Sequence, residues 1–190
     1  MKLSLEDRQK YQLIFDSTSE CEVFFRYKAH MIELNKLSLS INLARITKDE
    51  AIETLRRALV YSMRIGDRLV LHCGKYNIDF MSQFNDPVNF PIEKIFNFEE
   101  WRKEENYKSI VRPSEDVDLL GNKKCYFMNE NFDIVIVRDV SGETEADDKR
   151  DDFKAKVPLL DSNFDIYFVS RDLHNKDETK PNPYVPLQGI

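Results

Sequence analysis

The amino-acid sequence predicts an α/β fold with a mainly parallel sheet sandwiched by helices. A helical pattern over 47–66 leads directly into the short apolar run 68–73. Two more apolar runs, 131–138 and 163–170, both open with Asn-Phe-Asp-Ile, and the charged segment 143–156 lies between them. Continuous apolar runs are typical of strands that are covered on both faces, as in parallel sheets. We therefore expect these strands to be parallel, with segment 143–156 as a crossover helix.

The helix expected over 47–66 has the clearest boundaries in the sequence. Thr47 and Glu50 have the spacing of a capping box, in which each side chain accepts a hydrogen bond from the backbone at the helix start. Gly66 readily takes the left-handed conformation that ends a helix. Apolar side chains recur on one face, at Ala51, Ile52, Leu55, Ala58, Leu59 and Met63. A helix followed by a glycine and a buried strand is typical of an α/β layer.

An N-terminal helical extension is predicted to precede this core. The helical pattern runs from Leu5 to Leu43, and Ser19 with Glu22 has capping-box spacing at the start of its second part. An apolar stripe follows at three- and four-residue intervals, at Val23, Tyr27, Met31, Leu34 and Leu37. The stripe predicts packing on the domain or on a neighbouring chain.

The chain is expected to divide into three parts. A helical segment over 1–46 is followed by the α/β core over 47–172 and by a proline-containing arm over 173–190. Within the core, the stretch 74–121 is interrupted by prolines and rich in aromatic residues, which predicts rings buried across the sheet edge and a short helix around 98–107.

Composition and charge restrict the function classes. The net charge of -6 over 190 residues argues against a nucleic-acid-binding protein, which normally presents a basic face. No apolar stretch is long enough for a transmembrane helix, and the first residues lack a signal-peptide pattern. Cys21, Cys73 and Cys125 lie far apart without the CxxC spacing of a zinc site, so we expect reduced thiols. The expected location is cytoplasmic, without membrane or nucleic-acid partners.

No intact phosphate-binding or dinucleotide-binding motif is present. A P-loop needs glycines whose backbone N–H groups surround a phosphate, a lysine that reaches it, and a serine or threonine for magnesium. Gly74-Lys75 is followed by Tyr76, and Leu69 stands where the loop needs its first glycine. Gly121 has no glycine partner for a dinucleotide fingerprint. The sequence therefore predicts no cofactor, no metal and no catalytic residue.

His72 has the most informative position of the three histidines, because it ends a predicted strand, where α/β folds place functional residues. His30 lies beside an apolar helix face and His174 lies in the polar arm. Two interpretations of His72 remain open: it has a functional role, or it is a structural histidine held by hydrogen bonds. His72 cannot activate the Cys73 thiol, since adjacent strand residues point to opposite faces.

A candidate ligand-binding set lies near the strand ends, where open α/β sheets bind their ligands. Its members are Gly74, Lys75, Arg138, Asp139 and Arg171. The two arginines could hold a phosphate. Asp139 could hold a magnesium ion through water, or it could be a solvated turn residue. The acidic run over 143–152 is interpreted either as a solvated helix face or as a docking surface for a basic partner.

Two parts of the chain resemble AAA-type modules of dynein heavy chains. Residues 52–59 and 66–74 form a helix, a glycine and an apolar strand with a short polar exit. Residues 164–170 with 180–186 look like the dynein strand that runs into an Asn-Pro-containing loop. Such degenerate modules are also expected in ciliary ankyrin-repeat proteins with IQ motifs. The resemblance implies a P-loop-NTPase-like sheet without NTPase chemistry, since the Walker A motif is absent, and a setting in a cilium or axoneme.

The sequence thus predicts a non-catalytic interaction or structural domain. The expected partners are other proteins of a larger assembly, bound through the N-terminal helices and the C-terminal arm. The alternative is a nucleotide-binding or nucleotide-hydrolysing enzyme with an unorthodox site, in which Lys75, Arg138, Asp139 and Arg171 converge at the strand ends.

Overall fold

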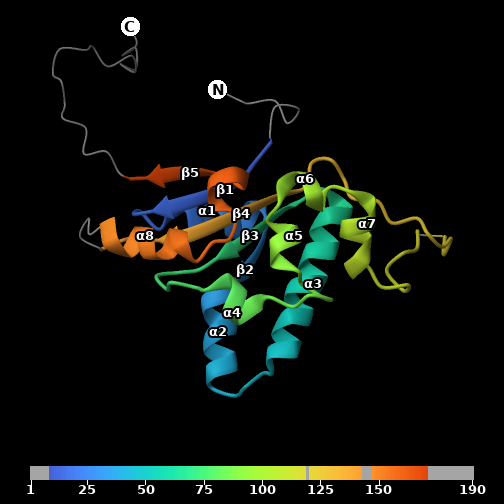
Figure 1. The fold of residues 1–190 in the computed structure, drawn as a ribbon, viewed down its shortest axis with the longest axis horizontal. Helices are drawn as coiled ribbons and strands as arrows, with labels where there is room; N and C mark the ends of the chain where they lie inside the picture. The colour runs from blue at the N-terminus through green and yellow to red at the C-terminus, as the bar shows by residue number, and fades with distance from the viewer. Residues whose placement is uncertain (1–8, 119, 143–146, 171–190) are drawn as a thin grey trace, which may run out of the picture.

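The computed structural model describes residues 9–118, 120–142 and 147–170. These residues form one five-stranded sheet in which all pairs are parallel, in the order β2-β3-β4-β1-β5 (Figure 1). The strands are β1 (Tyr11–Asp16), β2 (His30–Glu33), β3 (Arg68–His72), β4 (Asp133–Asp139) and β5 (Phe164–Val169). The predicted parallel α/β fold is therefore confirmed. Its strand order differs from those of dinucleotide-binding and flavodoxin-like sheets.

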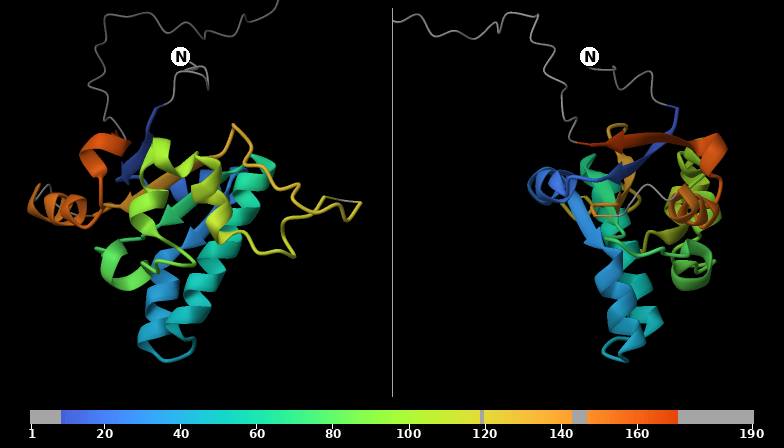
Figure 2. Two further views of the ribbon diagram at one scale, coloured as in Figure 1. Left: turned by 45° about the vertical axis from the view of Figure 1, so that its right-hand side comes forward. Right: turned by 90° about the vertical axis from the view of Figure 1, so that its left-hand side faces the viewer.

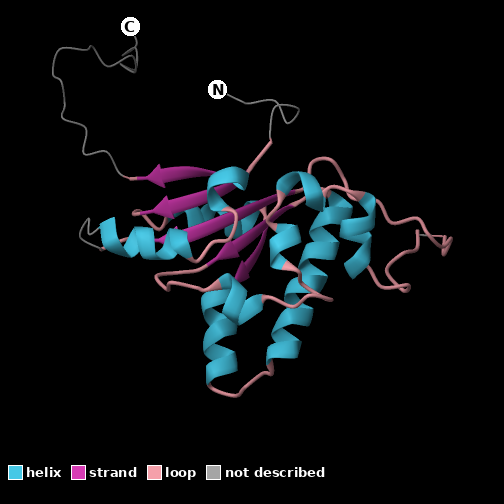
Figure 3. Cartoon of the chain, viewed as in Figure 1, coloured by secondary structure: helices cyan, strands magenta, loops and turns pink. Residues whose placement is uncertain are grey.

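Helices cover the two faces of the sheet unequally (Figures 2 and 3). The more densely covered face carries α3 (Lys48–Ile65), α4 (Phe80–Phe84), α5 (Ile92–Ile95), α6 (Phe98–Trp101), α7 (Glu104–Tyr107), α8 (Asp147–Ala155) and α9 (Leu160–Asn163). Among the described helices, α1 (Glu20–Lys28) alone supplies the buried core of the opposite face. Helix α2 (Leu34–Asn42) pairs with α3 beyond the sheet edge, and η2 (Lys108–Ile110) is a short 3-10 turn.

Helix α3 begins and ends as the sequence predicts. Both hydrogen bonds of the capping box between Thr47 and Glu50 are present, and Gly66 ends the helix at φ 73°. A Cβ at Gly66 would lie 2.5 Å from Oδ1 of Asn129, so both the backbone conformation and the neighbouring side chain require glycine here.

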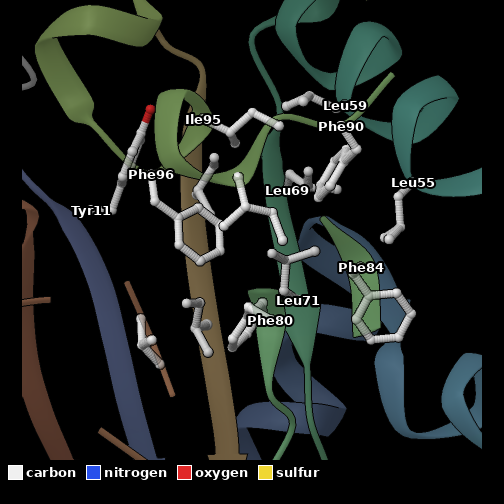
Figure 4. Close-up of a cluster of buried hydrophobic side chains, with 14 of the residues drawn as sticks. Tyr11, Leu55, Leu59, Leu69, Leu71, Phe80, Phe84, Phe90, Ile95 and Phe96 are labelled. Carbon is white, nitrogen blue, oxygen red and sulfur yellow. The ribbon is translucent and has the colours of Figure 1, made fainter. Parts of the chain in front are cut away.

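The larger core lies between α3 and the sheet (Figure 4). Leu55 and Leu59 of α3 face Leu69 and Leu71 of β3 across this core. The aromatic stretch 74–121 contributes Phe80, Phe84, Phe90, Phe96, Phe98 and Trp101, all of them buried. The predicted burial of these rings is confirmed, but they cover one face of the sheet rather than its edge.

The prediction that residues 1–46 form a helical extension is wrong within the described part. Tyr11–Asp16 is β1 and His30–Glu33 is β2, so this segment supplies two strands of the sheet. In β1, one aromatic and apolar run is buried almost completely, because the strand lies between β4 and β5. The predicted stripe does not exist as one face, since Val23 and Tyr27 of α1 are 60% and 81% exposed.

The two repeated apolar runs are parallel strands, as predicted, but they do not pair with each other. β1 lies between β4 and β5 and pairs with both. β4 is buried on both faces, whereas β5 is an edge strand whose Phe168 is 56% exposed, so the prediction of full cover is wrong for β5.

Helix α8 lies within the predicted crossover segment, and the arm over 173–190 lies outside the described residues. None of the described helices combines the length and apolar composition needed to cross a membrane.

Candidate functional site

A cleft of about 450 Å³ lies at the carboxyl ends of β2, β3 and β4, which we call the carboxyl-edge cleft. Its lining comprises Glu22, Glu33, Asn35, Lys36, His72, Gly74, Lys75, Tyr76 and Asp139. Glu33, His72 and Asp139 are the last residues of the three strands. Because parallel strands all end at this side of the sheet, the topology brings together residues that are distant in sequence.

The carboxylate of Asp16 closes the turn between β1 and α1. Its Oδ1 accepts hydrogen bonds from the N–H of Thr18 at 2.8 Å and from the Thr18 hydroxyl at 2.6 Å, and its Oδ2 accepts one from the N–H of Cys21 at 2.8 Å. Burial raises the pKa of Asp16, but these hydrogen bonds outweigh burial and lower the pKa below its ordinary value. Backbone N–H groups at a helix start are the donors that a phosphate would need. Here the chain's own carboxylate binds them.

The predicted capping box of Ser19 and Glu22 is wrong. Ser19 precedes α1 with a left-handed φ of 61° and makes no side-chain capping bond. Thr18 Oγ1 accepts from the N–H of Glu20 at 3.1 Å, and Asp16 accepts from the next residue, so these two side chains already satisfy the helix start.

His72 is buried in the lining of the carboxyl-edge cleft, with 5% of its side chain exposed. Its Nε2 lies 3.9 Å from Oε2 of Glu22, and its Nδ1 has no hydrogen-bond partner. Burial lowers the pKa of His72, although Glu22, Glu33 and Asp139 act in the opposite direction. A fully hydrogen-bonded structural histidine would have a partner at both ring nitrogens, whereas Nδ1 of His72 has none in the described residues.

The neighbouring Cys73 lies on the other face of the sheet, within the larger core. Burial raises the pKa of the Cys73 thiol, and the expectation that His72 does not activate it is consistent with this separation. Burial, together with the neighbouring Asp16 carboxylate, also raises the pKa of Cys21 to about 12, so neither thiol is activated as a nucleophile.

The structure brings together three of the five candidate residues. Gly74, Lys75 and Asp139 line the carboxyl-edge cleft. Lys75 Nζ donates to the carbonyl oxygen of Ser141 at 2.7 Å, and Asp139 Oδ1 accepts from the N–H of Ser141 at 2.7 Å. Gly74 has a φ of 58°, and a Cβ there would lie 2.7 Å from Nδ2 of Asn35, so the glycine lets the strand exit pass close to α2.

Arg138 does not converge on this cleft, which corrects the prediction. Its side chain is buried on the opposite face, where Nε donates to Oδ1 of Asn77 at 3.2 Å and the guanidinium lies 5.8 Å from the ring centroid of Phe153. Arg138 and Asp139 are adjacent strand residues and therefore point to opposite faces. Arg171 lies outside the described residues.

Sequence reasoning missed Asp16, Glu22, Glu33 and Asn35. Asp16 and Glu33 end β1 and β2, and Glu22 and Asn35 lie in the helices that follow these strands, whereas the sequence predicted a helical segment here. The usable signal was the polar residue at the end of each short apolar run, as in the sequence Leu-Ile-Phe-Asp that ends at Asp16. Within the described residues, no three His, Cys, Asp or Glu side chains are arranged to hold a metal ion.

A second cavity, of about 610 Å³, lies beside α3. His30, Tyr61, Arg57, Arg64 and Glu115 are among its lining residues. The His30 ring packs edge-on against Tyr61 at 5.5 Å, and its Nδ1 lies 3.1 Å from Oγ of Ser62. This histidine is therefore held by the protein, unlike His72.

Comparisons with known proteins do not identify a family. No family model matches the chain, and neither a curated protein nor a solved structure matches it. The resemblance to dynein modules therefore rests on the sequence stretches described above.

Proposed function

We propose that the chain is a non-catalytic interaction domain of a larger protein assembly, built on a P-loop-NTPase-like sheet whose phosphate position is closed. The turn between β1 and α1 carries this proposal. Asp16 binds its donors, and Glu20 and Glu22 add two carboxylates in the first turn of α1, so a phosphate would meet both occupied donors and negative charge. The strand order, with β1 enclosed between β4 and β5, is compatible with such a sheet.

Exposed apolar side chains on α1 support the role in protein binding. Val23, Phe24 and Tyr27 are 60%, 55% and 81% exposed, on the helix that supplies the buried core of the sparsely covered face. Single exposed apolar residues are normal on a protein surface, but several on one helix favour a contact surface. The proposed partners are other proteins of the assembly, and the proposed setting in a cilium or axoneme follows from the resemblance.

The second candidate is a nucleotide-binding enzyme with an unorthodox site. It is favoured by the shared position of Lys75 and Asp139 in the carboxyl-edge cleft. It is weakened by Arg138, which contacts Phe153 and Asn77 on the other face and therefore cannot hold a phosphate beside them.

Thermal unfolding with ATP, ADP and GTP, each with and without magnesium, separates the two candidates. A ligand that binds only the folded chain raises its Tm, by an amount that grows with ligand concentration. We expect no saturable shift with any nucleotide. A saturable shift that is abolished in Asp139→Ala would support the enzyme and contradict the proposal.

The interaction role is tested with a surface variant of α1. In a crosslinking experiment on ciliated-cell extract, Phe24→Ser with Tyr27→Ser should lose the specific crosslinked products of the wild-type chain. Leu120→Ser, which changes an 88% exposed residue elsewhere, is the matched control and should retain them. Identical products from all three chains would rule out α1 as the contact surface.

A further inference from the structure

His72 leaves one hydrogen-bond acceptor unsatisfied in the carboxyl-edge cleft. Its Nε2 faces the carboxylate of Glu22 at 3.9 Å, which favours the proton on Nε2 and leaves Nδ1 as an acceptor. Nδ1 is buried and has no hydrogen-bond partner. A buried polar atom without a partner costs free energy. We therefore expect a hydrogen-bond donor from outside the chain to bind this nitrogen.

Asn35 supplies a second unsatisfied acceptor to the same cleft. Its Oδ1 is buried without a partner, and it stands in the first turn of α2 with its side chain against the backbone of Gly74. Two of the buried side-chain atoms that lack a partner in the described residues thus belong to residues that line one cleft.

Asp139 carries the one carboxylate of the cleft lining that forms no ion pair among the described residues. Lys36 pairs with Glu33 at 2.7 Å and Arg26 pairs with Glu22 at 2.5 Å, so these two carboxylates are compensated. Lys75 Nζ donates to the backbone carbonyl of Ser141 and forms no ion pair with Asp139 in the described residues. Asp139 accepts hydrogen bonds from Ser141 and Ser19, but within the described residues no lysine, arginine or histidine forms an ion pair with its carboxylate.

We propose that the carboxyl-edge cleft binds the guanidinium group of an arginine side chain on a protein partner. This inference rests on the proposed interaction function and names the partner's chemistry at one site. His72 Nδ1, Asn35 Oδ1 and the Asp139 carboxylate can all accept hydrogen bonds from N–H donors. The Asp139 carboxylate also favours a positively charged donor. A guanidinium offers five N–H donors in a planar fork, carries a permanent positive charge and has no acceptor of its own. A phosphate or a carboxylate ligand would instead add acceptors where donors are missing.

Imidazole NMR signals of the intact chain test this binding directly. The probe is the capped tripeptide acetyl-Gly-Arg-Gly-amide, and the matched control peptide carries citrulline, which has nearly the same shape but no charge. His72→Gln assigns the His72 signal. We expect a saturable shift of that signal with the arginine peptide, and an at least about tenfold weaker effect with citrulline. The His30 signal is the internal control, because His30 lies in the other cavity and is held by Ser62.

Asp139→Asn separates the charge from the shape of the site. The amide can still accept from Ser141, so the turn is retained, while affinity for the arginine peptide should fall about tenfold. Asp165→Asn removes an exposed carboxylate from the edge strand β5 and should leave affinity unchanged.

Three outcomes overturn the inference. The first is no shift of the His72 signal at high peptide concentration, which would mean that the cleft holds water only. The second is an equal shift of the His72 signal with the citrulline peptide. The third is an equal shift of the His30 signal with the arginine peptide. A failure here leaves the proposed function standing if nucleotides also produce no thermal shift, because α1 then remains the contact surface. A nucleotide-dependent shift would instead remove the proposed function itself.

Discussion

Replacing Arg56 by methionine is expected to destabilise the fold by about 3 kcal/mol. The Arg56 side chain is 2% exposed in α3 and binds the carboxylates of Glu53 and Glu115, with nitrogen–oxygen distances between 2.7 and 2.9 Å. Its Nη1 also donates to the carbonyl oxygen of Ile110 at 2.9 Å. Methionine fills much of the same volume but leaves this carbonyl without a donor, at a cost of roughly 1–3 kcal/mol. Glu53 and Glu115 are 30% and 25% exposed, so water partly solvates them and the total stays near the lower end of the ~3–5 kcal/mol typical of a broken buried pair.

Urea unfolding followed by circular dichroism measures this loss. In a thermal scan the same loss should lower the Tm by about 6–12 °C for a domain of this size. Arg56→Lys retains the charge but lacks the planar fork, so it should lose an intermediate amount. Arg57→Met is the matched control, because Arg57 is the next residue and is exposed, and it should remain within about 0.5 kcal/mol of wild type. A similarly small change in Arg56→Met would refute the view that this cluster ties α3 to the chain around 110–115.

Three further predictions concern the strand ends. Asp16→Ala removes three hydrogen bonds to a carboxylate and should cost about 2 kcal/mol in urea unfolding, with a smaller loss in Asp16→Asn. Because burial lowers the folded-state pKa of His72 below 6.5, the unfolded chain binds that proton first, and the free energy of unfolding should fall as the pH drops below about 6.5. His72→Gln should flatten this dependence between pH values near 7.5 and 5.5, and an unchanged slope would contradict the assignment. Gly74→Ala should cost about 1–2 kcal/mol, and more than Gly121→Ala, because both glycines have a positive φ but only Gly74 has a side chain within 4 Å.

Sequence reasoning succeeded where local signals and tertiary packing agree. Helix α3 carries its capping box at Thr47, an apolar face and Gly66, and each of these acts within a few residues. The apolar runs of β3 and β4 are long enough to stand out as buried strands, and they were correctly predicted as parallel.

The failures at β1, β2 and β5 have a common physical origin. β1 is buried through pairing with β4 and β5, and such pairing between distant segments leaves no local signature beyond a short apolar run. β2 has only four residues, each partly exposed, so helical periodicity outweighed it. The composition of β5 matches a central strand, and only the strand order places it at an edge. The candidate cleft was therefore predicted only where β3 and β4 end. The part of its lining that Glu22, Glu33 and Asn35 form was missed.

The position of β1 constrains how the chain can fold. Residues 12–16 pair with residues 135–139 of β4, and residues 11–16 pair with residues 164–169 of β5. During synthesis, an interval therefore passes between the appearance of β1 and that of its two partner strands. At typical rates of synthesis, about 5–20 residues per second, that interval is on the order of ten seconds. Before β4 emerges, β3 has no link to β1 within the sheet, and the apolar side of α1 has only part of its core. The sheet therefore closes late and through contacts of high sequence separation, which favours slow folding and makes the nascent chain dependent on protection of its first strand.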